Sequence, residues 1–446
     1  MKPSRLLAFS LVPFLGSAPL IAATFTWDGG SGADSNIATA ANWNPDGTPP
    51  SDLVNTNLAF DGIVRTAPNF STVFSVNSVT LNNNAAVNPF TLTGAGLTIG
   101  ATGIVNNDAN PATFVTTVKL GTASTTFNAA TGPLTFTGTV TLGTSTLNVM
   151  GGQATTLSSA ITGTGLINKT GAGTLTLPNG NLSADVTVGG GLVDFNSTGT
   201  TTFDSSSVVA VNSGTLLASG NMTLNGTQLT RSAGASVTLA AAKTLTIQNG
   251  GDAIFTGGHT QSTAATINVT GAGSTFALSG GSAFQGGSTL NITAGGSVSN
   301  SSYIDIGTSG SGTVLVDGAG SSFSASTPSY WGRSGNPATV TFANSATGNI
   351  GNTEIANQGA GSTGTVFVQS GATLAVGNLI LATTTDAATA TITVNGVGSA
   401  VTQTGAAFLI MGAASGSTGT LNVQSSSIFN TSGTATINTT GTVAIA

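Results

Sequence analysis

The sequence predicts an all-β protein, a right-handed parallel β-helix (β-solenoid), and three observations carry this prediction. The first is a five-residue phrase that recurs seven times: a small residue, Thr, an apolar residue, any residue and an apolar residue. Its copies are Ala265–Val269, Ser288–Ile292, Gly312–Val316, Ala338–Phe342, Gly364–Val368, Ala390–Val394 and Gly419–Val423. Such recurrence is typical of a solenoid, in which each unit buries its apolar face against the next.

The second observation is the step between the copies. Counted from the first apolar residue of each copy, the successive steps from Ile267 to Leu421 are 23, 24, 26, 26, 26 and 29 positions. Within a copy the apolar positions alternate with other residues, so one side of each strand faces inward. We therefore expect inward ladders at equivalent positions of stacked strands, formed by Val314, Val316, Val366, Val368, Ile392 and Val394.

The third observation is composition. Only 5% of the residues are charged and 63 of the 446 are Gly, with one His and no Cys. Gly, Thr, Val, Ser and Asn are poor helix formers, so short strands are expected throughout. At roughly 24 residues per coil, about 17 coils with a strand spacing of about 4.8 Å would form a rod about 80 Å long. The coils are expected to wind in the right-handed sense, because connections between parallel strands of one sheet are almost always right-handed.

Two other all-β folds are the alternatives, an array of β-sandwiches and a β-propeller. Sandwich domains need longer strands and an aromatic core in each unit of ~100 residues, and only 6% of this chain is aromatic. Propeller blades recur every ~40–45 residues. Neither fold fits the shorter steps between the copies of the phrase.

Residues 1–23 are predicted to be a secretory signal peptide. Lys2 and Arg5 precede the apolar segment Leu6–Leu20, and Ile21–Ala23 forms a cleavage site with small residues. A single membrane anchor is the alternative, which Pro and Gly within the apolar segment disfavour. Cleavage would leave 6 of the 8 basic residues against 14 acidic ones. Scattered cations in such small number exclude nucleic-acid binding, and no later apolar run is long enough to span a bilayer.

Three zones follow the signal peptide. Residues 24–87 hold Trp27, Trp43 and five Asp residues and are predicted to cap the end of the solenoid. Residues 88–258 form an irregular solenoid of shorter strands, and residues 259–446 a regular one with the 23–29-residue repeat.

Two stretches resemble known repeat families. Leu166–Leu177, followed by Val186–Leu192, resembles the autotransporter-associated β-strand repeat, although the usual Tyr-x-Gly-Gly-Thr segment is missing. The regular zone resembles the repeat found with autotransporters and PEP-CTERM proteins, on the residues Val269–Ser274, Val316–Ser321, Val394–Ser399, Ile306–Thr313 and Met411–Thr420.

The resemblance implies an exported stalk, secreted or displayed at the cell surface or outer membrane, with a role in adhesion. The chain ends at Thr439–Ala446 in mid-pattern, without the C-terminal domain of autotransporters or a Pro-Glu-Pro sorting signal. We therefore expect a chain truncated at its C-terminus.

Few residues are candidates for chemistry. The segment Tyr330, Trp331 and Arg333 is the candidate ligand-binding site, because aromatic rings beside Arg can stack on sugars; the alternative is an irregular coil whose Trp covers the solenoid. His259, within Gly257–Thr260, is expected to be an exposed turn residue. Asp28, Asp34, Asp46, Asp52 and Asp61 have the oxygen ligands of a Ca²⁺ site but match no known loop, so no metal site or cofactor is predicted.

We predict a non-enzymatic stalk or adhesin-like passenger, whose partners are surface glycans or other components of the cell envelope. The alternative is a polysaccharide-acting β-helix enzyme, a lyase or glycosidase, since Asp305 and Asp317 could meet across one coil. Asp305 falls at an outward position of the repeat and Asp317 at a turn, and polar residues are expected at both positions without a catalytic role. No catalytic residue is therefore predicted.

Overall fold

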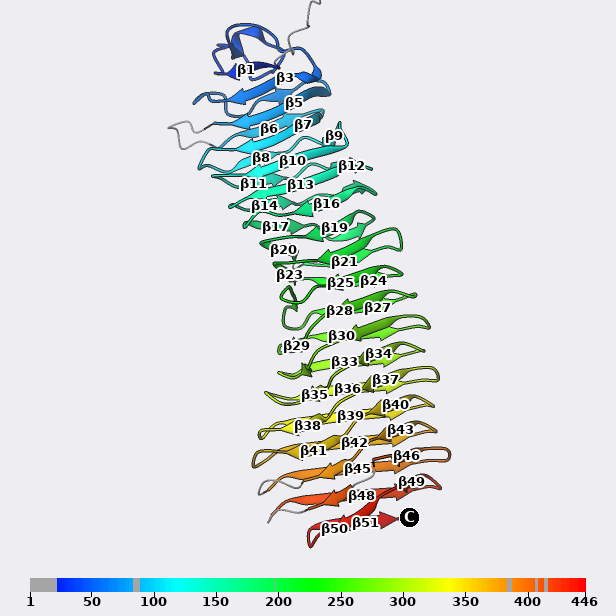
Figure 1. The fold of residues 1–446 in the computed structure, drawn as a ribbon. Helices are drawn as coiled ribbons and strands as arrows, with labels where there is room; N and C mark the ends of the chain where they lie inside the picture. The colour runs from blue at the N-terminus through cyan, green and yellow to red at the C-terminus, as the bar shows by residue number, and fades with distance from the viewer. Residues whose placement is uncertain (1–21, 83–88, 197, 383–386, 406–407, 413–415) are drawn as a thin grey trace, which may run out of the picture.

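The computed structural model describes residues 22–82, 89–196, 198–382, 387–405, 408–412 and 416–446, with the backbone alone for 408–411. The predicted signal peptide therefore lies outside the described residues, except for Ala22 and Ala23. The described chain winds into a parallel β-solenoid of about 16 turns and contains one short 3-10 helix, η1 (Ala40–Asn42). Figure 1 shows a long column of stacked coils. The all-β parallel solenoid is thus confirmed, and its right hand stays a prediction.

The strands form four sheets. Sheet 1 has 22 strands and runs the length of the column: β1 (Ala23–Trp27), β2 (Trp43–Asn44), β3 (Asp52–Phe60), β5 (Phe74–Leu81), β7 (Leu97–Asn106), β9 (Val118–Leu120), β10 (Ser124–Ala129), β12 (Val140–Gly143), β13 (Thr146–Gly151), β15 (Ile161–Gly163), β16 (Leu166–Lys169), β19 (Asp185–Val188), β22 (Val208–Val211), β25 (Gln228–Arg231), β28 (Asp252–Phe255), β31 (Thr275–Leu278), β34 (Ser297–Asn300), β37 (Ser322–Ala325), β40 (Thr347–Ile350), β43 (Thr373–Val376), β46 (Ala400–Gln403) and β49 (Ile428–Thr431).

Sheet 2 has nine strands in the N-terminal half: β4 (Asn69–Phe70), β6 (Thr91–Gly94), β8 (Ala112–Phe114), β11 (Leu134–Phe136), β14 (Thr155–Leu157), β17 (Thr174–Leu177), β20 (Leu192–Phe195), β23 (Thr215–Ala218) and β26 (Ser236–Leu239). Sheet 3 has 12 strands: β18 (Gly180–Leu182), β21 (Thr200–Phe203), β24 (Asn221–Asn225), β27 (Thr244–Gln248), β30 (Thr266–Thr270), β33 (Ser288–Thr293), β36 (Gly312–Asp317), β39 (Pro337–Ala343), β42 (Thr363–Gln369), β45 (Thr389–Asn395), β48 (Thr418–Gln424) and β51 (Gly441–Ile445).

Sheet 4 has eight strands in the C-terminal half: β29 (Thr260–Gln261), β32 (Ser282–Phe284), β35 (Ile304–Ile306), β38 (Ser329–Arg333), β41 (Thr353–Asn357), β44 (Leu379–Leu381), β47 (Phe408–Met411) and β50 (Thr434–Ile437). In chain order, a coil of the C-terminal half visits sheets 1, 4 and 3 in turn. In the coils before it, sheet 2 stands where sheet 4 later stands.

The register of sheet 3 confirms the predicted steps. Ile267 pairs with Leu290, Leu290 with Val314, and the series continues through Val340, Val366 and Ile392 to Leu421. The six residues expected to form inward ladders are all buried, at 0 or 1% exposure. Coils are shorter nearer the N-terminus. There, Lys169 pairs with Val188, which is only 19 positions later in the chain.

The coils turn at equivalent places through residues with left-handed backbone. Gly307 (φ 68°) directly follows Ile306, the last residue of β35, and Gly332 (φ 78°) follows its register partner Trp331 within β38. A side chain at Gly307 would also meet the carbonyl oxygen of Pro337 at 2.2 Å. Gly is suited to such a corner because it has no Cβ to clash with the backbone.

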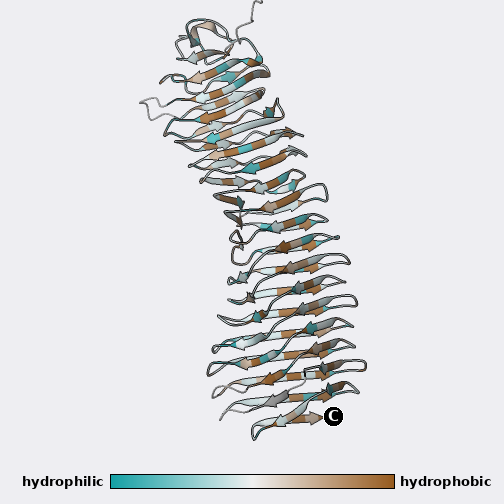
Figure 2. Ribbon diagram, viewed as in Figure 1, coloured by the Kyte–Doolittle hydropathy of each residue, from teal (hydrophilic) through white to brown (hydrophobic). Residues whose placement is uncertain are grey.

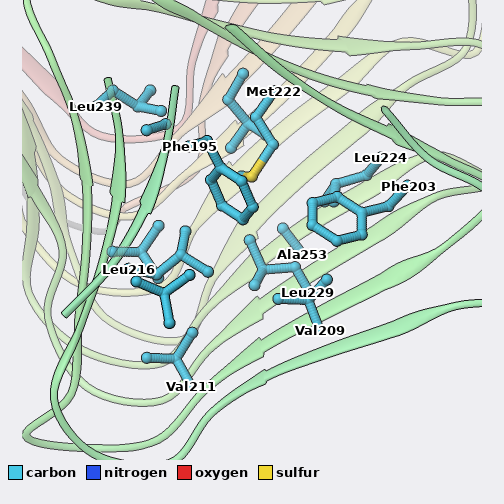
Figure 3. Packing of buried hydrophobic residues seen from close by; sticks show 14 of the residues in the cluster. Phe195, Phe203, Val209, Val211, Leu216, Met222, Leu224, Leu229, Leu239 and Ala253 are labelled. Carbon is cyan, nitrogen blue, oxygen red and sulfur yellow. The ribbon is translucent and has the colours of Figure 1, made fainter. Parts of the chain in front are cut away.

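The core is one continuous cluster inside the column. In Figure 2 apolar residues form bands within the strands, with polar residues between them. Figure 3 shows how three sheets contribute side chains to it: Val209 and Val211 from sheet 1, Phe195 from sheet 2, and Phe203 and Leu224 from sheet 3.

The sheet order changes in the middle of the column. Sheet 2 ends with β26 and sheet 4 begins with β29, and the column changes direction near these strands (Figure 1). The predicted division between residues 258 and 259 falls beside this change. At the N-terminal end, Trp27, Trp43 and Phe60 pack their rings together within the predicted cap. The strands β3 and β5 of that region already belong to sheet 1, so the solenoid begins inside it.

We expect the substitution Val366→Asp to lower the free energy of unfolding by roughly 3 kcal/mol or more, because it buries an unpaired carboxylate between Val340 and Ile392. Urea denaturation at neutral pH would measure this. Thr365→Asp is the matched control, since the Thr365 side chain lies outside the buried core. Equal loss in both variants would show that the inward and outward positions are assigned wrongly.

Candidate functional site

The predicted binding segment lies on β38 in sheet 4. Its three residues do not share one side of the strand. Trp331 pairs with Ile306 in the preceding coil and Ile355 in the following one, and its ring is 1% exposed within the core. A sugar cannot stack on a ring in this position. Only Tyr330 and Arg333 of the predicted segment reach the surface.

Tyr330 and Arg333 contact each other on the outer side of sheet 4. The guanidinium carbon of Arg333 lies 4.5 Å from the centre of the Tyr330 ring, in a cation–π contact. Each side chain is half-buried. The pair therefore presents one aromatic ring, covered on one side by a cation.

Two carboxyl groups flank this pair along the column. Asp305 lies on β35, one coil before Tyr330, and its Oδ1 accepts a hydrogen bond of 2.9 Å from the Tyr330 backbone N–H. Glu354 lies on β41, one coil after, directly opposite Tyr330 in the register. Asp305, Tyr330, Arg333 and Glu354 are hereafter called the sheet 4 cluster.

The outward position of Asp305 was expected to be solvated, which is wrong, because neighbouring coils leave this residue 7% exposed. Glu354 is half-buried, and the burial of these two residues sets the electrostatics of the sheet 4 cluster. Burial raises the pKa of Asp305 to about 6, although the Tyr330 N–H and the positive charge of Arg333 oppose the shift. Burial also raises the pKa of Glu354, against the attraction of Arg333. Arg333 thus acts on both carboxyl groups, one on each side.

Sequence reasoning missed Glu354 and the role of Asp305 beside Tyr330. The signal was present in the repeat, because the spacing from Asp305 to Tyr330, and again from Tyr330 to Glu354, matches one coil. The three residues must therefore stack. The alternative pairing of Asp305 with Asp317 does not form this site, since Asp317 ends β36 in sheet 3 and its Oδ1 accepts a hydrogen bond from Asn344 Nδ2.

The prediction for His259 was wrong. Its side chain is 6% exposed and lies edge-on to the rings of Phe255 and Phe276, with centroid distances of 5.1 and 6.0 Å. Burial, and then the charge of Arg231, lowers the pKa of His259 to about 4, so the imidazole is neutral at physiological pH. The Gly residues before His259 do form a turn, but the chain enters β29 directly after it and the ring points into the core.

Arg231 is a buried cation beside His259 that sequence reasoning also missed. Its guanidinium lies 5.0 Å from the centre of the Phe255 ring and donates hydrogen bonds to the carbonyl oxygens of Thr256 and Gly257, at 3.1 and 3.0 Å. This contact lies where sheet 2 has ended and sheet 4 begins. Arg231 therefore supplies hydrogen bonds to backbone carbonyls at the interruption of the sheets.

Two of the N-terminal Asp residues accept hydrogen bonds from backbone N–H groups close to them in the chain. Asp28 Oδ1 accepts a hydrogen bond from the Gly30 N–H, and Asp52 Oδ1 from the N–H groups of Val54 and Asn55. Across the described ranges, no group of three His, Asp or Glu side chains is arranged to hold a metal ion. In the same part of the chain, no helix has the length and apolar character required to cross a membrane.

Comparison with known proteins gives one similar structure. Neither a scan against protein-family models nor a search of curated proteins gave a match. The crystal structure of the TibC-catalyzed hyper-glycosylated TibA55-350 fragment is similar at 16% sequence identity and a TM-score of 0.30, covering 83% of this chain and 99% of that fragment. The two repeat families stay predictions.

We expect His259 and Asp305 to make opposite contributions to the pH dependence of stability. The pKa of His259 is lower in the folded chain than its ordinary value of 6.5, so the folded state loses about 3 kcal/mol as the pH falls from about 6.5 to about 4. The pKa of Asp305 is raised from 3.8 to about 6, so the folded state gains stability as the pH falls through this window.

The variants His259→Leu and Asp305→Asn separate the two effects. Urea denaturation at about pH 7 and about pH 4.5 should show a smaller acid loss in His259→Leu and a larger one in Asp305→Asn than in the wild type. An unchanged acid loss in His259→Leu would contradict the buried neutral imidazole.

Proposed function

We propose that the protein is an exported, non-enzymatic stalk of the cell surface or extracellular space, with an adhesin-like passenger role. The observation that supports this best is the unbroken course of sheet 1 from β1 to β49. Each coil packs only on its neighbours, so the molecule can be long without a central pocket. Such a column separates its two ends, which is the mechanical task of a stalk.

The proposed contact with a ligand is the exposed part of the sheet 4 cluster, and surface glycans are the proposed partners. Arg333 can donate hydrogen bonds to sugar hydroxyls and the half-buried Glu354 carboxylate can accept them, whereas Asp305 is buried at 7% exposure. The Tyr330 ring adds an apolar face. Trp331 takes no direct part because it is buried.

A polysaccharide-acting enzyme is the second candidate, and the raised pKa values of Asp305 and Glu354 are the observation that favours it. Glycosidases need two carboxyl groups about 5 to 9.5 Å apart, with substrate between them. Asp305 and Glu354 are two strands apart, about 9.6 Å at a spacing of about 4.8 Å. Tyr330 lies between them in the register and carries Arg333 over its ring, so the intervening space is filled. This arrangement favours binding over catalysis.

For the stalk, we expect small-angle X-ray scattering of the purified chain to give a rod of about 80 Å, from about 16 turns at a strand spacing of about 4.8 Å. Antibody labelling and protease treatment of intact cells should find the protein outside the membrane. A compact profile, or protection from protease until the cells are lysed, would contradict the proposal.

For the glycan contact, we expect Tyr330→Ala and Arg333→Ala to reduce binding on a glycan array by about tenfold or more, since each removes a direct contact. Tyr303→Ala is the matched control, because Tyr303 is the other Tyr of the chain and is 40% exposed outside the cluster. Equal effects of the Tyr303 and Tyr330 substitutions would place the contact elsewhere.

The same preparation should not turn over pectin, alginate, xylan or peptidoglycan with Ca²⁺ present, because the space between Asp305 and Glu354 is filled by Tyr330 and Arg333. Product release would be measured by reducing-sugar and unsaturated-product assays. Turnover that disappears in Asp305→Asn or Glu354→Gln would replace the stalk proposal by the enzymatic one.

A further inference from the structure

One outward row of sheet 3 is Thr without interruption over nine coils. Equivalent positions in the register are paired from β27 to β51. The row, hereafter the Thr row, consists of Thr244, Thr266, Thr289, Thr313, Thr339, Thr365, Thr391, Thr420 and Thr442. All nine side chains are half-buried or exposed, whereas the next residue of the strand faces the core in all but the last coil. The sheet therefore presents a straight line of Thr side chains to solvent.

Strand propensity alone does not account for the Thr row. Thr favours strands because of its branched Cβ, but this preference acts on every sheet. The corresponding outward row of sheet 1 contains Thr275, Ser297, Ser322, Thr347, Thr373 and Ala400. The outward row of sheet 4 contains Ala283, Asp305, Tyr330, Glu354 and Ile380. Of these three rows, the one in sheet 3 alone is filled by a single residue type.

The hydroxyl groups of the Thr row do not stabilise the sheet either. Among the described residues, none forms a hydrogen bond with any of these nine hydroxyls. Neighbouring rows behave differently: Thr293 Oγ1 donates to Thr270 Oγ1, and Asn291 Nδ2 to Asn268 Oδ1, each at 2.9 Å. The nine hydroxyls are thus available to a partner outside the protein.

The surface around the Thr row is almost without charge. From β27 to β51 the strands of sheet 3 contain a single charged residue, Asp317. The strands therefore favour a neutral partner, because they offer a charged group only that carboxylate, with Lys243 at one end of the row beside Thr244. The partner must also be periodic, since the row offers the same hydroxyl and methyl groups at every strand spacing of about 4.8 Å.

We infer that the Thr row binds the surface of ice. Water oxygens along one axis of hexagonal ice repeat at a distance close to the spacing of the strands. Each Thr hydroxyl can donate and accept a hydrogen bond with lattice water, and each methyl group is apolar surface whose removal from bulk water is favourable. The rigid parallel pairing keeps the array in place before binding, so little side-chain ordering is required.

The test uses the purified chain in two assays, inhibition of ice recrystallisation and microscopy of single ice crystals. The wild type should slow recrystallisation and shape crystals. The double variant Thr339→Tyr/Thr365→Tyr should need about tenfold more protein for the same inhibition, because two large side chains interrupt the row of hydroxyl and methyl groups. Thr365→Val, which keeps the methyl groups and strand preference, should lose activity to a smaller extent.

Thr230→Tyr is the matched control, since Thr230 is an outward, half-buried residue of sheet 1. It should retain wild-type activity, and circular dichroism melting would confirm that all variants fold. Inactivity of the folded wild type in both assays would overturn the inference. So would equal losses in the Thr230 control and the Thr row variants. Retention of the wild type on crystalline cellulose without ice activity, lost in the double variant, would overturn it too and assign the row to a solid glycan. None of these outcomes depends on the rod shape, the cell-surface location or the sheet 4 cluster.

Discussion

In-register parallel pairing is the constraint on which the rest of this structure depends. Each residue of a strand stacks on its equivalent one coil away, so the neighbours of a side chain are distant in the chain, as Lys169 and Val188 or Ile392 and Leu421 are. An inward position is satisfied only if its neighbours above and below are also apolar and of compatible size. Val340, Val366 and Ile392 meet this condition in sheet 3. In sheet 3 the coil therefore changes its length at the corners between strands, whereas the N-terminal coils also contain register shifts within the paired strands β3, β5 and β7.

The corners explain the buried polar residues. One inward row at the end of the sheet 1 strands includes Lys169, Arg231, Asn300 and Gln403 among apolar residues. Each donates to backbone carbonyl oxygens of nearby turns: Lys169 to Gly171, Asn300 to Gly280 and Tyr303, Gln403 to Gly405. Arg231 does the same at the change from sheet 2 to sheet 4. Burial lowers the pKa of Lys169 and Arg231, which is the electrostatic cost of placing cations there. Buried carbonyl groups left without hydrogen bonds at these corners would also lower the free energy of unfolding.

The sequence was sufficient to predict what the repeat itself determines. The steps of the regular zone and the inward ladders are confirmed because both follow from alternation within a strand and recurrence between strands. Local sequence was misleading at His259, where Gly and Thr neighbours indicate a turn but the ring enters an aromatic part of the core. It was also insufficient at Trp331, because the side of the strand on which its ring lies is determined by Ile306 and Ile355 in other coils. Residues one coil apart decide burial here more than residues next in the chain.

This division has a consequence for where function can arise in such a molecule. Inward positions are fixed by packing, and corner positions by backbone conformation and carbonyl groups, so both have little freedom to carry a ligand. Outward positions lack these restraints, and in sheets 1 and 4 they vary from coil to coil. The sheet 4 cluster, in which burial raises the pKa values of Asp305 and Glu354, is therefore a local exception that the packing of the core does not require. The Thr row is the opposite case, uniformity at positions where variation is tolerated, and uniform chemistry at a fixed spacing favours a partner that is itself a lattice.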